Sequence, residues 1–384
     1  MAWTRYQLML AFVMVTTGSI NSITTKWADL LESKGRDGVV RPFDHPFVQA
    51  LSMFFGEFLC LVMFNILYKV YSRRRDGSED VHVLTKGNRH FNRFILLIPA
   101  MCDMTATSIM YIGLNLTYVS SFQMLRGSVI IFVALLSVTF LDKVIKRRQW
   151  SGIFLIILGL VIVAMTDIIY KDMSGPSFGP NSIITGDLLI VFAQIITSIQ
   201  MVIEEKFVHG LDIPPLQAVG WEGVFGFLVL GLLQIPFYFI YVGHPFSNNS
   251  RGVLEDVIDA FVQINNNPLL LLAILGTILS IAFFNFAGIS VTKEMSATHR
   301  MVLDSVRTIV IWMISLFLFH QKFHWLQLVG FVSLLIGMFI YNGLTLTMVY
   351  VKARSILIGL RYSRVNGEDV KNLAADEPGE SSNP

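Results

Sequence analysis

Two long segments of the chain, 104–165 and 280–343, are copies of one pattern. Glycine, leucine and polar residues recur at a constant separation of 178 residues: Gly152/Gly330, Gly159/Gly337, Ser137/Ser315, Gln149/Gln327 and Leu125/Leu303. Many secondary transporters consist of two membrane halves duplicated in this way, with the substrate held between them near the bilayer midplane. The repeat therefore makes a carrier the first hypothesis.

The composition independently indicates a membrane protein. Hydrophobic residues make up 54% of the chain and charged residues only 15%, whereas soluble domains contain roughly 25% charged residues. Cys60 and Cys102 both fall within apolar runs, so they predict no disulfide framework. The formal net charge of +2 gives no reason to expect a nucleic-acid partner.

Apolar runs of about 20 residues are long enough to cross the hydrocarbon layer of a bilayer. Because the chain contains five such runs in each half, the second half must enter the membrane with the opposite orientation. We therefore predict an all-α polytopic membrane protein with ten transmembrane helices in two inverted five-helix repeats, within residues 1–171 and 180–352, followed by a disordered tail at 353–384. The runs lie near 6–25, 47–70, 94–113, 119–141, 149–166, 184–204, 216–242, 269–291, 297–319 and 325–350.

The basic residues predict the orientation, since Lys and Arg accumulate in short cytoplasmic loops. With the N-terminus in the cytosol, that side collects 19 Lys and Arg residues against 7 on the other side. Both termini are therefore expected in the cytosol, and the loops 26–46 and 243–268 on the luminal or extracellular side. Asn248 begins a glycosylation sequon, Asn248-Asn249-Ser250, in the second of these loops.

Ionisable residues inside the apolar runs are costly in a bilayer, so each indicates a functional or a paired role. With two amides in similar positions, they give these candidates for substrate binding or gating: Glu57, Asp103, Gln123, Arg126, Glu222, Asn285, Arg300 and Asp304. A carboxylate buried at low dielectric tends to keep its proton, so Glu57 and Glu222 suit a proton-coupled carrier. The alternative for either residue is a protonated, hydrogen-bonded structural role.

Arg126 and Asp304 occupy equivalent positions of the repeat and carry opposite charges. Because the two helices are expected to enter from opposite faces, Arg126 would lie toward the lumen and Asp304 toward the cytosol. The hypothesis is that they belong to opposite gates of one central cavity. The alternative for Asp304 is local neutralisation by Arg300 and Arg307, which lie on the same helical face.

Other residues at the predicted helices have structural interpretations. Glu204, Glu205 and Asp187 lie near helix ends, where a solvated boundary is the expected role. Two sets of glycines are expected to permit close helix contacts: Gly220, Gly223 and Gly226, and Gly152 and Gly159 with Gly330 and Gly337. No metal-ligand spacing, phosphate loop or nucleophile motif is present, so we expect no enzyme activity, cofactor or metal.

Four segments carry a family resemblance: Ser-Ser-Phe-Gln-Met-Leu-Arg-Gly at 120–127, Glu-Glu-Lys-Phe at 204–207, Phe-Asn-Phe-Ala-Gly at 284–288 and Ser-Ala-Thr-His-Arg-Met-Val-Leu-Asp at 296–304. Together they resemble the drug/metabolite transporter superfamily and, within it, the F subgroup of solute carrier family 35, from the N-terminus to about residue 345. The resemblance implies a secondary carrier that moves a small-molecule solute across a lipid bilayer. The tail beyond about residue 350 does not resemble the family pattern.

The resemblance leaves the cargo open. Better-known members of the family exchange nucleotide sugars, and related carriers move small cations or peptides out of acidic compartments. The apolar runs hold three Arg against five acidic residues, which favours a small polar or zwitterionic metabolite over a diphosphate. A nucleotide-sugar antiporter and a non-transporting scaffold or regulator on a carrier fold are the alternatives.

The resemblance also bears on location, because similar members are associated with lysosomal and mitochondrial membranes. Tyr362 and Val365 form a tyrosine-x-x-apolar motif of the kind that endolysosomal sorting adaptors recognise. We therefore expect the lysosomal membrane, with mitochondrial and Golgi or endoplasmic reticulum membranes as alternatives. The paired glycines on the fifth and tenth runs make a homodimer conceivable.

Overall fold

Long helices account for most of the structure, a computed structural model that describes residues 4–72, 86–114, 116–117, 122, 124–142, 144–169, 180–243, 249–318 and 325–341. The helices are α1 (Arg5–Leu30), α2 (Pro46–Ser72), η2 (Arg93–Leu96), α3 (Leu97–Leu114), η3 (Arg126–Ser128), α5 (Val129–Leu141), α6 (Arg147–Ile169), α7 (Pro180–Glu204), η4 (Glu205–His209), α8 (Pro215–Phe237), α9 (Val257–Asn266), α10 (Pro268–Glu294), α11 (Ala297–Leu318) and α12 (Trp325–Tyr341). Two short strands, β1 (Glu32–Lys34) and β2 (Val40–Pro42), form an antiparallel hairpin.

Within the described ranges, seven helices are long and apolar enough to cross a membrane: α1, α2, η2 with α3, α6, α7 with η4, α8 and α10. The apolar helices formed by η3 with α5 and by the end of α12 are shorter. Helix α11 has 22 residues but carries Arg300, Asp304 and Arg307. Each of the ten predicted runs thus overlaps a helix, and the architecture is that of a polytopic membrane protein.

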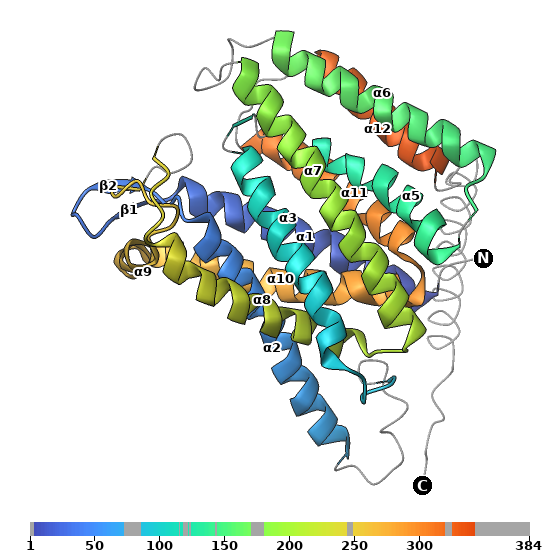
Figure 1. Cartoon of the computed structure of the whole chain (residues 1–384), viewed down its shortest axis with the longest axis horizontal. Coiled ribbons are helices and arrows are strands. Elements are labelled where there is room, and N and C mark those ends of the chain that lie inside the picture. Colours follow the sequence, from blue (N-terminus) through green and yellow to red (C-terminus); the bar gives the residue numbers. More distant parts are fainter. Residues whose placement is uncertain are drawn as a thin grey trace, which may run out of the picture.

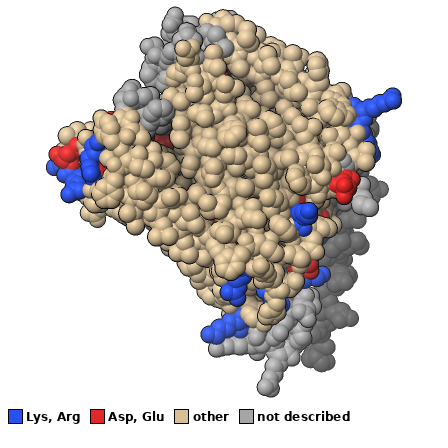
Figure 2. Space-filling model, viewed as in Figure 1, with Lys and Arg blue, Asp and Glu red and all other residues tan. Residues whose placement is uncertain are grey.

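The outer surface of the bundle is apolar. Large side chains such as Phe12, Phe154, Leu188, Leu232 and Leu279 are more than 60% exposed. Figure 2 shows one face of the bundle almost free of charged residues, which gather on the projection at the left and along the right and lower edges. Because soluble monomeric proteins rarely expose large apolar patches to water, this surface fits contact with lipid tails.

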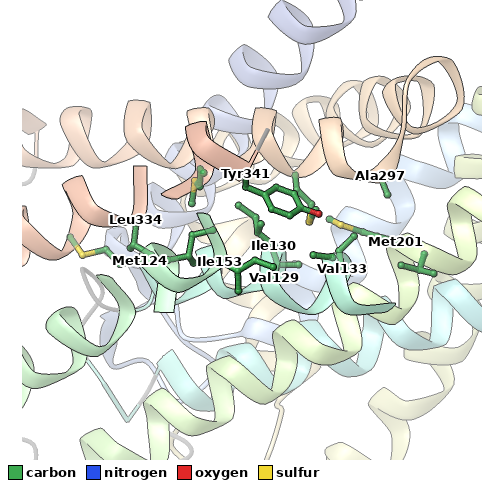
Figure 3. Close-up of a cluster of buried hydrophobic side chains, with 14 of the residues drawn as sticks. Met124, Val129, Ile130, Val133, Ile153, Met201, Ala297, Leu334 and Tyr341 are labelled. Carbon is green, nitrogen blue, oxygen red and sulfur yellow. The ribbon is translucent and has the colours of Figure 1, made fainter. Parts of the chain in front are cut away.

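The helices pack in pairs that join the first half of the chain to the second. Helix α1 packs against α10, α2 against α8, α3 against α7, and α6 against α12, while α5 contacts both α7 and α11. In Figure 1, α6 and α12 run side by side at the upper right, and α3 and α7 cross the centre. A buried cluster with Val129, Ile130, Ile153 and Leu334 joins α5, α6 and α12 (Figure 3).

Glycines set the spacing of the α6–α12 pair, as the sequence predicted. A Cβ atom at Gly152 would lie 2.7 Å from the carbonyl oxygen of Gly337, and one at Gly159 would lie 2.6 Å from that of Gly330. Gly220, Gly223 and Gly226 pack equally closely on α2. The glycines that suggested a homodimer therefore make a contact within one chain.

We expect Gly159→Ala to lower the free energy of unfolding by about 1–3 kcal/mol. Alanine favours a helix by about 1 kcal/mol over glycine, but its methyl group would meet the backbone of Gly330, which cannot move away as a side chain can. Thermal unfolding in detergent measures the change. Gly210→Ala is the matched control, because nothing lies within 4 Å of a Cβ there. Equal melting temperatures for the two variants would contradict the close contact.

The two loops predicted on one side of the membrane meet in a small layer at one end of the bundle, and its two strands were not part of the all-α prediction. We call residues 31–45, with the β1–β2 hairpin, and residues 249–266, with α9, the cap. Ser33 Oγ donates a hydrogen bond to the Gln263 carbonyl oxygen (2.6 Å), and Arg41 forms a 2.9 Å ion pair with Asp259. Figure 1 shows the cap at the left and the N-terminal end of the chain at the right.

Candidate functional site

A central cavity of about 410 Å³ lies in the middle of the bundle. Helices α1, α2, α3, η3, α5, α7, α10 and α11 line it, so both predicted halves contribute. Six predicted site residues lie on it: Glu57, Asp103, Arg126, Asn285, Arg300 and Asp304. Glu222 is buried but is not among the lining residues. Gln123, Asn248, Tyr362 and Val365 lie outside the described residues.

The acidic part of the cavity lies where α2, α3 and α10 meet. The Glu57 side chain is 4% exposed and accepts a short hydrogen bond from the Asn285 amide of α10. Asp103 of α3 accepts a 3.4 Å hydrogen bond from Thr107. Gly223 of α8 packs on the backbone of Glu57, which puts the neighbouring Glu222 behind this part of the wall. One carboxylate oxygen of Glu222 has no hydrogen-bond partner among the described residues.

The solvated role expected for Glu204 and Glu205 is wrong. Glu204 is 1% exposed, forms an ion pair with Arg300 and accepts a 2.8 Å hydrogen bond from Gln200. Glu205 accepts a hydrogen bond from the backbone amide of Ala297, the first residue of α11. Since α7 continues into η4 beside the start of α11, these carboxylates meet protein donors instead of water. The available signal was Arg300, a buried cation that requires an acidic partner.

The boundary role expected for Asp187 is also wrong. Asp187 is 8% exposed and accepts a 2.7 Å hydrogen bond from the Thr117 hydroxyl. It lies on α7 against the end of α3, where Gly113 and Gly186 allow close approach. Asp187 is therefore a buried structural acid that does not line the cavity.

The basic part of the cavity is formed by Arg126 and Arg307. Arg307 pairs with Asp304 at 2.8 Å, as expected for neighbours on one helical face, whereas Arg300 pairs with Glu204. The Arg126 guanidinium lies 5.8 Å from the centre of the Phe122 ring. The described part of the chain places no carboxylate within 4 Å of it. Arg126 is therefore a partly buried cation on the cavity wall that can receive an anionic group of a solute.

Two more cavity residues were assigned to a loop in the sequence interpretation. Helix α1 extends to Leu30, beyond the predicted end at residue 25, and carries Lys26 and Asp29 into the wall. The lining thus has four acids and four bases: Asp29, Glu57, Asp103 and Asp304, and Lys26, Arg126, Arg300 and Arg307. A balanced set of this kind can hold a small molecule that carries charges of both signs.

A buried ionic network holds the cap together, and no sequence motif indicated it. His45 Nδ1 lies 2.6 Å from Glu255 and its Nε2 lies 3.4 Å from Asp259. Burial alone would lower the pKa of His45, but the hydrogen bonds and charges of Asp259 and Glu255 outweigh it and raise the pKa to about 9. Burial would raise the pKa of Asp259, but hydrogen bonds from His45, the Arg36 amide, Gln263 and Arg41 hold it well below its usual range.

These shifts predict a cap that loosens in base and resists acid. A raised His45 pKa adds stability that is complete below about pH 6.5 and is lost as the pH rises through about 9. A lowered Asp259 pKa adds stability that is lost only as the pH falls through that lowered value. We expect His45→Gln to cost about 3 kcal/mol at pH 6 and much less at pH 10. Melting temperatures at the two pH values test this, with Val39→Gln on the exposed hairpin tip as control.

Comparisons with known proteins agree with this architecture. The sequence pattern of the SLC35F group of solute carrier family 35 matches residues 48–240, and that of the EamA-like transporter family matches residues 184–343. The chain is 55% identical to solute carrier family 35 member F6 of Rattus norvegicus, over 90% of each chain. It is 54% identical to the Homo sapiens protein of that name, over 90% of this chain and 91% of the other. One crystal structure matches with a TM-score of 0.53 and 11% identity over 88% of this chain and 96% of that chain, a likeness in fold alone.

Proposed function

The chain belongs to solute carrier family 35, and from this premise we propose that it moves a small, zwitterionic metabolite by secondary active transport with alternating access. Membership makes it an integral, multi-pass membrane transporter of the drug/metabolite superfamily, in a family of transporters and not of enzymes. The cargo, the coupling and the mechanism are our proposals. The observation that carries them is a central cavity between helices of both halves, lined by buried groups of both charges.

The distribution of charge supports a zwitterionic cargo. An ammonium group fits the side of Glu57 and Asp103, and a carboxylate fits the side of Arg126. A nucleotide sugar carries a diphosphate that needs several uncommitted cations. Arg300 and Arg307 are already paired with Glu204 and Asp304, respectively. The cavity volume of about 410 Å³ also lies toward the small end for ligand pockets.

Proton coupling is supported by the buried carboxylates. Glu57 accepts a hydrogen bond from the Asn285 side-chain amide, which is a neutral donor. Glu57 also lines the cavity, where a solute can reach it. A buried carboxylate without a cationic partner is costly unless it is neutralised. We infer that Glu57 carries the coupled proton and that Glu222, behind it, exchanges protons with it.

Helix pairing supports alternating access between two inverted five-helix repeats. The α2–α8, α5–α11 and α6–α12 pairs each join equivalent helices of the two halves. The repeat also relates the α1–α10 pair to the α3–α7 pair. The glycine contacts are reciprocal in the same way, because Gly152 with Gly337 and Gly330 with Gly159 are related by the repeat. In this scheme Arg126 and Asp304 act at opposite gates. Single charge reversals that leave transport and its direction unchanged would exclude that role.

Reconstituted transport tests the proposal. Purified protein in proteoliposomes with an imposed pH gradient would be screened for uptake of pooled small metabolites, with the Glu57→Gln/Arg126→Ala double variant as control. Gradient-dependent uptake that the variant lacks is the expected result. Uptake only into vesicles preloaded with a nucleotide would favour a nucleotide-sugar antiporter instead. An absence of flux for every pool would favour the non-transporting scaffold.

We also propose that both termini face the cytosol and that the protein resides in the lysosomal membrane. The two loops that were assigned to one side of the membrane meet in the cap, which supports the orientation. If Asn248 carries a glycan, the protein should be sensitive to a glycosidase, and Ser250→Ala should abolish this sensitivity. Tyr362→Ala is expected to move the protein from lysosomes to the cell surface. A mitochondrial or Golgi location that is the same in Tyr362→Ala as in the parent would contradict the sorting proposal. It would also remove the reason to expect adaptor partners.

A further inference from the structure

A second cavity of about 420 Å³ lies between the cap and the helix bundle. We call it the vestibule. It shares Asp29, Tyr111 and Leu114 with the central cavity, and its other walls include cap residues 41–45 and Gln263. A solute that moves between the central cavity and the cap side of the protein therefore has the vestibule beside its path.

The two cations in the vestibule wall, Arg41 and His45, are neutralised by carboxylates that do not line the vestibule. Arg41 lies 2.9 Å from both Asp37 and Asp259, and His45 contacts Glu255 and Asp259. These two cations are thus matched by three carboxylates. The remaining basic residues of the cap, Lys34, Arg36 and Arg251, do not line the vestibule.

Two further carboxylates, Asp29 and Asp44, line the same cavity. Asp29 accepts a 2.6 Å hydrogen bond from the Gln49 amide, a neutral donor. Lys26 interacts electrostatically with Asp29 but lines only the central cavity. Among the residues that the structure describes, Arg41, His45 and Lys26 stand against five carboxylates, so the described part of the vestibule and its network is net negative.

An unsatisfied acceptor points to a ligand that donates hydrogen bonds or carries positive charge. Gln263 is 0% exposed and lines the vestibule. Its amide nitrogen donates to Asp259 at 2.7 Å, while its amide oxygen has no partner among the residues that the structure describes. A buried acceptor without a donor is costly. The rings of Phe43 and Tyr111 add aromatic faces to the wall, which attract cations.

We propose that the vestibule is a second binding site, selective for organic ammonium groups, that concentrates them beside the central cavity. Carboxylates, an unpaired amide oxygen and aromatic rings together are the groups that recognise an ammonium ion. This site rests on the proposed function and deepens it, because it binds the ammonium group of the zwitterionic solute outside the central cavity. It also disfavours an anionic solute approaching from the cap side.

A thiol placed where the two cavities share a wall reports the electrostatic potential of the vestibule without a transport assay. Leu114→Cys in a Cys60→Ser/Cys102→Ala background would be labelled with trimethylammonium-ethyl and sulfonato-ethyl methanethiosulfonates. Val39→Cys on the exposed hairpin tip corrects for the intrinsic difference between the reagents. We expect the corrected ratio of cationic to anionic labelling rates at Leu114→Cys to be about tenfold or more. Asp29→Asn should lower the ratio, and Glu32→Gln, which removes an exposed carboxylate in the cap but outside the vestibule wall, should not.

Protection by tetramethylammonium distinguishes a binding site from a field. Tetramethylammonium should slow labelling at Leu114→Cys saturably, should not slow it at Val39→Cys, and should lose this effect in Asp29→Asn. Absence of protection, equal corrected rates, or a thiol that neither reagent reaches would each overturn the proposal. Asp44→Asn serves as the second variant if Asp29→Asn is not monodisperse. Protection without flux in proteoliposomes would uphold the vestibule while contradicting the proposed transport.

Discussion

Glu204→Gln is expected to lower the free energy of unfolding by about 3–5 kcal/mol, because it leaves the buried Arg300 guanidinium without its negative partner. Glutamine can still accept the hydrogen bond from Gln200, so the loss reports mainly on charge. The Arg300 Nε has no hydrogen-bond partner among the described residues, which adds to the cost of removing the Glu204 charge. Denaturant titration in detergent micelles measures the change.

Two controls separate the ion pair from a general effect of substitution. Glu294→Gln removes an exposed carboxylate at the end of α10 and should change stability by less than about 0.5 kcal/mol. Replacing both partners, as in Glu204→Leu/Arg300→Met, should recover most of the lost stability, since an apolar pair of similar size has no charge to desolvate. A Glu204→Gln variant as stable as the parent would mean that Arg300 is neutralised in another way.

Glu57→Gln is expected to reduce uptake driven by a pH gradient at least about tenfold, in line with the loss of a group that transfers a proton. The glutamine oxygen can accept the hydrogen bond from Asn285, so the wall of the cavity keeps its shape. Exchange of labelled for unlabelled solute across the same membranes should continue, because exchange needs no net proton movement. The ratio of driven uptake to exchange is therefore the quantity to measure.

Asp187→Asn is the matched control for this experiment. It neutralises another buried carboxylate in a membrane helix, but one that contacts Thr117 and does not line the cavity. Both driven uptake and exchange should stay near the parental values. A Glu57→Gln variant that keeps gradient-driven uptake, or one that loses driven uptake and exchange equally, would argue against Glu57 as the coupling residue.

Hydropathy predicted the helices well because lipid contact requires long apolar runs, whatever their packing. The cost of burying charge also identified five ionisable residues that line one cavity, including Glu57 and Arg126. The role predicted for Glu204 was wrong, because a charge near the end of an apolar run is expected to be solvated, whereas here a neighbouring helix brings Arg300 beside it. The pairing of acidic with basic residues depends on tertiary packing, which the spacing of apolar residues along the sequence does not reveal.

The cap was beyond sequence reasoning for a related physical reason. Its stability comes from contacts of Arg41 and His45 with Asp259, which lies more than 200 residues further along the chain. Both segments lack an apolar period. The distribution of Lys and Arg predicted that both segments lie on one side of the membrane, but it did not predict that they share a buried ionic network. Lys26 and Asp29 were missed similarly, because α1 continues as a helix beyond the end of its apolar run.

The contact between α6 and α12 also limits the order in which the protein can be completed during synthesis. Gly152 and Gly337 belong to helices made far apart in time. At roughly 5–20 residues per second, the ribosome needs about 10–40 s to produce the chain between them. Throughout that interval the glycine face of α6 has no partner of its own chain in the membrane. A chain that stops before α12 would keep this face uncovered, which gives membrane chaperones and quality-control proteases a defined surface by which to recognise unfinished molecules.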